Sequence, residues 1–138
     1  MKHRCILSLL ALAVLAASID AGAQGGTRPV TLSVAVDPRK PTGDAWDAFG
    51  GAPDIALCVN SALGQQCFSG TTVQPTPAFV RGACQDSFSC RFVVYVPTVG
   101  PFSVALYDVD LSQHDTIGAC MISGRGQRRC GAATVTSF

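Results

Sequence analysis

The chain has 138 residues, with ten basic and nine acidic side chains and a formal net charge of +1. This near balance argues against a broad electrostatic partner such as nucleic acid, so any charge effect must come from local clusters. The length suits one domain with a single core.

Residues 1–23 have the three parts of a secretory signal peptide. Residues 1–4 are basic, residues 5–19 form an apolar run, and Ala21-Gly22-Ala23 fits the small-x-small cleavage pattern. The run is shorter than the roughly 20 residues that a membrane-spanning helix needs. We therefore expect cleavage near Ala23, secreted or periplasmic localisation, no transmembrane segment, and one domain over residues 24–138.

Six cysteines remain in that predicted domain, and an even number in an exported chain indicates three disulfides. Fifteen pairings are open on the sequence alone. The spacing favours local pairs, Cys58 with Cys67, Cys84 with Cys90, and Cys120 with Cys130. A zinc site is disfavoured, because there is no C-x-x-C motif and only His114 follows the predicted cleavage site.

Strand patterns recur along the whole predicted domain, whereas helix patterns are nearly absent. Glutamate is missing from the chain, and Pro or Gly interrupts most windows. Apolar and polar residues alternate in short runs between turn residues, as they do in half-buried strands. The predicted strands and shorter β-favouring pieces are residues 30–36, 55–59, 67–68, 71–73, 79–81, 90–96, 102–107, 117–123 and 133–136.

The turns between these segments complete the fold prediction. Residues 62–66 would join a hairpin, residues 84–90 would form a tight loop, and residues 124–129 would form a flexible basic loop. We predict an all-β fold, an antiparallel β-sandwich of seven or eight strands stabilised by three disulfides.

Two loops, residues 43–54 and 107–118, hold six of the nine acidic residues, and all nine are aspartate. Carboxylates at that density repel one another in a folded protein unless a cation lies among them. Calcium takes six to eight oxygen ligands, and short aspartate side chains in turns supply them well. We therefore predict that the fold brings the two loops together around Ca²⁺.

The second loop resembles the third calcium loop of C2 domains, the calcium-dependent phospholipid-binding modules. A strand, residues 104–107, leads into Asp108-Val109-Asp110, and a short turn leads to Asp115, Ile117 and Gly118. The segment from Asp47 through Gly50-Gly51 to Asp54 is similar to the first calcium loop of that family. The resemblance covers residues 30–136 loosely, and its specificity lies in these two loops.

The resemblance implies a C2-like sandwich and a non-enzymatic calcium-binding function. Its implied calcium ligands are Asp47, Asp54, Asp108, Asp110 and Asp115, with Asp44 as an alternative to Asp47 in the first loop. It also implies that calcium-ordered loops bind anionic phospholipid or a protein partner. Trp46, Phe49 and Leu111 are the candidate apolar contacts at the loop tips, although a structural role for Trp46 is favoured.

Other interpretations of the same residues remain open. Each aspartate could serve turn chemistry alone, because Asp bonds to its own backbone in turns. The chain would then be a disulfide-stabilised protein-binding or inhibitor module with acidic loops that bind no calcium. Arg125, Arg128 and Arg129 would form a solvated patch or a site for an anionic head group. A hydrolase using His114 is disfavoured, because no nucleophile stands out.

Overall fold

Nine β-strands make up the computed structural model, which describes residues 26–47, 49–69, 80–81, 84–110 and 114–138. They are β1 (Thr27–Val36), β2 (Ile55–Ser61), β3 (Gly64–Ser69), β4 (Val80–Arg81), β5 (Ser89–Pro97), β6 (Phe102–Val109), β7 (His114–Ile122), β8 (Gly126–Cys130) and β9 (Ala133–Ser137). The predicted signal peptide, the β-favouring piece at 71–73 and Leu111 lie outside the described residues. Within the described ranges, no helix has the length and apolar character needed to cross a membrane.

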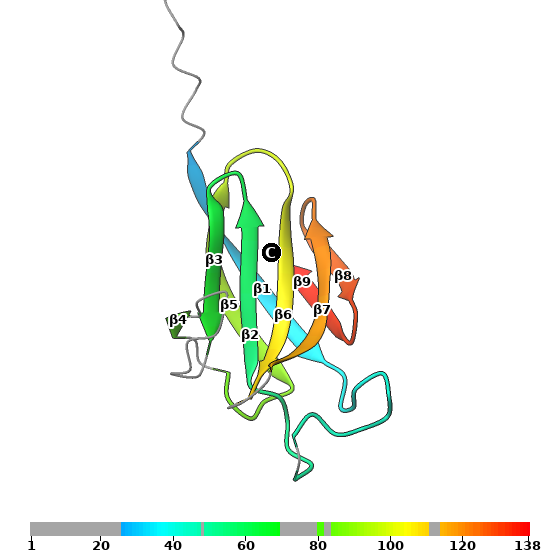
Figure 1. Cartoon of the computed structure of the whole chain (residues 1–138). Coiled ribbons are helices and arrows are strands. Elements are labelled where there is room, and N and C mark those ends of the chain that lie inside the picture. The colour runs from blue at the N-terminus through cyan, green and yellow to red at the C-terminus, as the bar shows by residue number, and fades with distance from the viewer. Residues whose placement is uncertain (1–25, 48, 70–79, 82–83, 111–113) are drawn as a thin grey trace, which may run out of the picture.

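The strands form two sheets that lie against each other (Figure 1). One sheet has the order β5-β1-β9-β8, and the other has the order β4-β3-β2-β6-β7. Every pairing is antiparallel except that of β4, which runs parallel to β3 over two residues. The prediction of an all-β, largely antiparallel sandwich is therefore confirmed, with nine strands where seven or eight were expected.

The alternation of buried and exposed residues explains why these segments form strands around one core. In β1, Val30, Leu32, Val34 and Val36 are buried, and the residues between them are more exposed. The strand β5 alternates in the same way. The strand β2 differs because residues 55–59 are all buried, with Ile55, Leu57 and Val59 in the main core and Ala56 and Cys58 in a second cluster. This double burial explains its unbroken apolar sequence.

Two expected loops are shorter than predicted. The predicted basic loop at 124–129 is mostly the strand β8, whose backbone pairs with β9 while its arginines remain exposed. Charged side chains suit such an edge strand because they discourage pairing with other chains. The predicted acidic loop at 107–118 is mostly strand too, because β6 runs through Val109 and β7 begins at His114.

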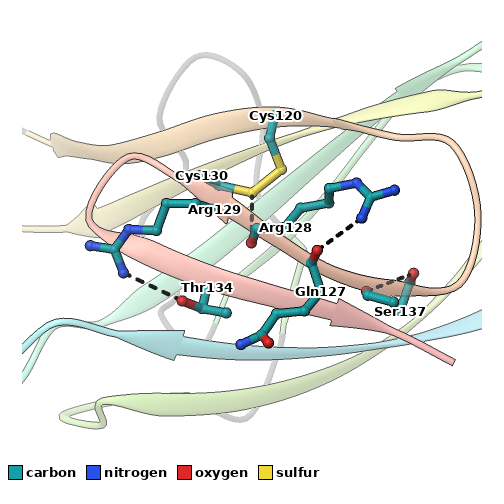
Figure 2. The surroundings of a disulfide bond; sticks show 8 residues. Cys120, Gln127, Arg128, Arg129, Cys130, Thr134 and Ser137 are labelled. Carbon is teal, nitrogen blue, oxygen red and sulfur yellow. Dashed lines mark hydrogen bonds between the residues drawn. A yellow bond between two sulfur atoms is a disulfide. The ribbon is translucent and has the colours of Figure 1, made fainter.

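The three local disulfides are confirmed. Cys58 and Cys67 face each other across β2 and β3, with Cα atoms 4.0 Å apart. Cys84–Cys90 closes the loop that precedes β5. Cys120–Cys130 joins β7 to β8 and therefore links the two sheets, as Figure 2 shows.

The sheets also meet through their backbones beside that last disulfide. The Ala132 N–H donates a hydrogen bond to the Ile117 carbonyl oxygen (2.9 Å). A Cβ at Gly118 would lie 2.0 Å from the Cys130 oxygen, and one at Gly131 would lie 2.5 Å from the Ile117 oxygen. Only glycine permits this approach, so the two glycines allow the sandwich to close along β7 and β8.

Three connections gather at one end of the sandwich (Figure 1). They are residues 37–47 and 49–54 between β1 and β2, residues 84–88 before β5, and Asp110 directly after β6 with the start of β7. The two acidic loops predicted to converge therefore lie at the same end of the molecule.

Candidate metal centre

Three aspartates from the two remote loops form a cluster. Asp47 lies in the connection between β1 and β2, Asp108 lies near the end of β6, and Asp110 directly follows that strand. One carboxylate oxygen from each lies within 4.8 Å of the others. Calcium binds its oxygens at 2.3–2.6 Å, so two ligands of one ion are at most about 5 Å apart. These three residues therefore have the spacing of ligands to a single ion.

Asp108 is the buried member of this cluster, with no solvent exposure. Its Oδ1 accepts a hydrogen bond from the Asp54 N–H (2.8 Å), and the Val109 N–H donates to the Asp54 carbonyl oxygen (3.0 Å). Its Oδ2 has no hydrogen-bond partner among the described residues. A buried carboxylate oxygen without a partner costs free energy, and a bound cation would offset that cost.

The electrostatics of the cluster point in the same direction. Burial raises the pKa of Asp108 to about 6, and the charges of Asp110 and Asp47 add to this rise, although the Asp54 N–H opposes it. Burial also raises the pKa of Asp47, with further contributions from Asp110, Asp54 and Asp86. The fold therefore holds these carboxylates so close together that their ionised forms repel one another.

Asp54 and Asp86 fasten the loops together. The Asp86 N–H donates to Oδ1 of Asp54 (2.7 Å), and Oδ1 of Asp86 accepts from the Ala52 N–H (3.0 Å). In the same disulfide-closed loop, the Ser87 N–H donates a hydrogen bond to the Pro53 carbonyl oxygen (3.0 Å). Asp54 therefore has a structural partner, and its predicted role as a calcium ligand stays a prediction.

Asp115 forms an ion pair with Lys40, which lies 75 residues earlier in the chain. Hydrogen bonding to Asp115 raises the pKa of Lys40, and the charges of Asp108 and Asp110 add to this rise. The Lys40 Nζ also lies 5.7 Å from the centroid of the Trp46 ring, a distance that allows a cation–π interaction. Asp115 lies beside the cluster, but the charge it faces is an ammonium group, and its role as a calcium ligand also stays a prediction.

The other predicted candidates in the first loop have different environments. The exposed Asp44 accepts a hydrogen bond from Oγ1 of Thr42 (2.8 Å) and is not among the three clustered aspartates. Trp46 is only 3% exposed, and its Nε1–H donates to the backbone carbonyl oxygen of Asp37 (2.8 Å), so its predicted structural role is confirmed. Phe49 is fully exposed at 103%.

The arginines of β8 have other partners than the clustered aspartates. Arg129 forms an ion pair with Asp37, which holds the pKa of that carboxyl below its usual range. Arg128 donates to the Gln127 oxygen (2.9 Å), as Figure 2 shows. Both arginines are exposed, as the prediction of a solvated patch expects, and the alternative of an anionic head-group site stays a prediction.

Two residues of this region were not predicted as part of the site. Lys40 directly precedes a proline after the first strand and gives no sign that it faces an aspartate 75 residues away. Asp86 gives a weak sign, because it lies in a loop closed by the predicted Cys84–Cys90 pair and has a positive φ of 44°. Aspartate tolerates that conformation better than most residues, which marks the loop as a shaped turn.

No protein-family model matches this chain, and a search of curated proteins found no similar sequence.

Proposed function

We propose that this protein is an exported, non-enzymatic calcium-binding β-sandwich module of the C2-like type. The observation that carries the proposal is the convergence of Asp47, Asp108 and Asp110, whose oxygens lie within 4.8 Å of one another. Asp108, a member of this cluster, is buried and its Oδ2 has no hydrogen-bond partner among the described residues, which supports the presence of a cation there. The resemblance of the two loops to C2 calcium loops supports the same function.

The donor set favours calcium over other metals. The clustered side-chain donors are carboxylate oxygens, which hard cations prefer. Zinc prefers cysteine thiolates and histidine, and the six cysteines at positions 58–130 form disulfides. Magnesium needs a near-ideal octahedron, whereas calcium accepts the irregular shell that three aspartates, loop carbonyls and water would supply.

Export fits both the disulfides and the predicted signal peptide. Three disulfides are typical of an oxidising compartment, either outside the cell or in a periplasm. In such calcium-rich surroundings, an affinity on the order of 10⁻⁴–10⁻³ M suffices, as for other extracellular calcium modules.

We further propose that the calcium-loaded loops contact anionic phospholipid. Calcium would neutralise the aspartates and let this end of the molecule approach a negatively charged surface. The fully exposed Phe49, two residues after Asp47, is suited to enter the interface between head groups and acyl chains.

Calcium titration of the purified, oxidised protein tests the central claim. We expect a rise in melting temperature at millimolar calcium, and a saturable heat of binding by calorimetry. The double substitution Asp108→Asn with Asp110→Asn should remove both signals, because it takes away two of the three clustered carboxylates. Asp44→Asn is the matched control, since it removes an aspartate of the same loop system outside the cluster.

An unchanged melting temperature of the wild-type protein at millimolar calcium would reject the calcium module. The chain would then be better described as a disulfide-stabilised protein-binding or inhibitor module whose aspartates form an acidic surface. A calcium response that survives the double substitution would place the ion elsewhere in the molecule.

A further inference from the structure

Lys40 places a positive charge against the aspartate cluster. Its ammonium group pairs with Asp115, and it interacts electrostatically with Asp108, Asp110 and Asp47. Only 22% of its side chain is exposed, compared with 36% for Asp115. A lysine that merely solubilised the loop would extend into water, so this position calls for an explanation.

The backbone and a neighbouring ring hold Lys40 in this place. The backbone N–H of Lys40 donates to the backbone carbonyl oxygen of Asp44 (2.9 Å), and the backbone carbonyl oxygen of Lys40 accepts from the Gly43 N–H (2.9 Å). These two hydrogen bonds close a tight turn that sets the direction of the lysine. The buried Trp46 ring lies beside the ammonium group, which restricts where the side chain can go.

The charges explain what such a lysine does to metal binding. Asp47, Asp108 and Asp110 carry three negative charges when ionised, and Asp115 adds a fourth beside them. Two divalent ions would need this fourth carboxylate as a ligand and would need the space beside it. The Lys40 ammonium group already pairs with Asp115 and fills the space beside that carboxylate. It also repels any cation that enters the neighbouring position.

We propose that Lys40 acts as a built-in cation that takes the place of a second cation at Asp115, beside the aspartate cluster, and limits the centre to one calcium ion. This inference rests on the proposed calcium function, because it describes the stoichiometry and affinity of that same centre. The lysine neutralises part of the cluster at all times, and calcium completes the neutralisation. Its removal should therefore create a two-ion site.

Calorimetric calcium titration of the oxidised full chain tests this, with Lys40→Met as the main variant. Methionine keeps the apolar stem beside Trp46 and removes the charge. We expect one ion in the wild-type protein and two in the variant, with the first bound about tenfold more tightly because a repulsive charge is gone. Lys40→Arg is the matched control that keeps the charge, and it should bind one ion with nearly wild-type affinity.

A second variant tests the location of the added ion. Lys40→Met combined with Asp115→Asn removes both the lysine and the ligand it covers, so this protein should bind one ion again. Lys40→Gln keeps hydrogen-bonding capacity towards Asp115 without charge, and it should bind two ions. It provides the test if the methionine variant does not fold.

Several results would overturn the inference. One ion bound with unchanged affinity by a folded Lys40→Met or Lys40→Gln protein would mean that Lys40 only fastens two loops together. A second ion that persists in the double variant would place the subsite away from Asp115. An absence of calcium binding by the wild-type protein would instead reject the proposed function, so the two failures are distinguishable.

Discussion

At the scale of single residues, Asp108 is the most informative side chain. It is completely buried, and its pKa rises from 3.8 to about 6 because burial and neighbouring carboxylates disfavour its charged form. The folded protein therefore holds a proton between about pH 4 and pH 6 that the unfolded chain has lost. By linkage, the free energy of unfolding decreases as the pH rises through this window.

We predict that the calcium-free protein loses stability between about pH 4 and pH 6. The loss attributable to Asp108 is on the order of 3 kcal/mol, because each pKa unit corresponds to about 1.4 kcal/mol. The measurement is urea unfolding in a calcium chelator over this pH range, with wild type compared to Asp108→Asn. The asparagine variant should lack the part of this decrease that Asp108 causes, keeping only the part that the raised pKa of Asp47 causes, and should be the more stable protein at pH 7.

The calcium-loaded protein should behave in the opposite way. Calcium binds the deprotonated carboxylate, so the stabilisation it provides should grow as the pH rises through about 6. Asp37 does not affect the stability change in this pH window. The pKa of its carboxyl is lowered, so its contribution to the free energy of unfolding is lost only as the pH falls below 3.8. A chelated wild-type protein with a flat or rising stability across the window would contradict the account of Asp108.

At the scale of elements, the contact of β7 with the turn between β8 and β9 closes the sandwich. The Cys120–Cys130 disulfide crosses between the sheets there (Figure 2), and so does the hydrogen bond from the Ala132 N–H to the Ile117 carbonyl oxygen. Gly118 lies at the point of closest approach. Since β7 also carries Asp115, a shift of this strand would disturb the surroundings of the aspartate cluster.

We predict that Gly118→Ala destabilises the protein by about 1–3 kcal/mol or more, because its Cβ would overlap the Cys130 backbone. Gly124→Ala is the matched control, since nothing lies within 4 Å of the Cβ it would add. Chemical unfolding of both variants measures the difference. Equal stability of the two would show that the sheets are not held as closely as described.

At the scale of the whole molecule, the sandwich has two unlike ends (Figure 1). One end carries the aspartate cluster, Lys40 and the exposed Phe49. The other end carries the turn between β2 and β3, where Leu63 is also exposed. A membrane contact that depends on calcium should use the first end alone.

We predict that the protein sediments with phosphatidylserine-containing vesicles only when calcium is present. Phe49→Ser should weaken this binding roughly tenfold, because partial insertion of one aromatic side chain contributes about 1–2 kcal/mol, and it should leave calcium affinity in solution unchanged. Leu63→Ser is the control at the opposite end and should bind like wild type. If the Leu63 variant lost vesicle binding and the Phe49 variant bound like wild type, the membrane contact would lie at the opposite end of the molecule.

The features that were predictable from sequence are mostly local ones. Residues 30–36 alternate because one face of β1 is buried, and each disulfide joins cysteines no more than ten residues apart. The strand β8 was missed because its arginines remain exposed and its pairing with β9 is made by the backbone. Backbone pairing leaves little trace in side-chain polarity.

The membership of the aspartate cluster depends on contacts between distant parts of the chain. The sequence marked two acidic segments, but it could not say that Asp47 meets Asp108 and Asp110 while Asp54 is tied to Asp86 and Asp115 to Lys40. The Asp108–Asp54 and Lys40–Asp115 contacts span 54 and 75 residues. Local patterns reflect which face of a strand is buried, whereas the choice among similar carboxylates is made only when the packed sheets bring their ends together.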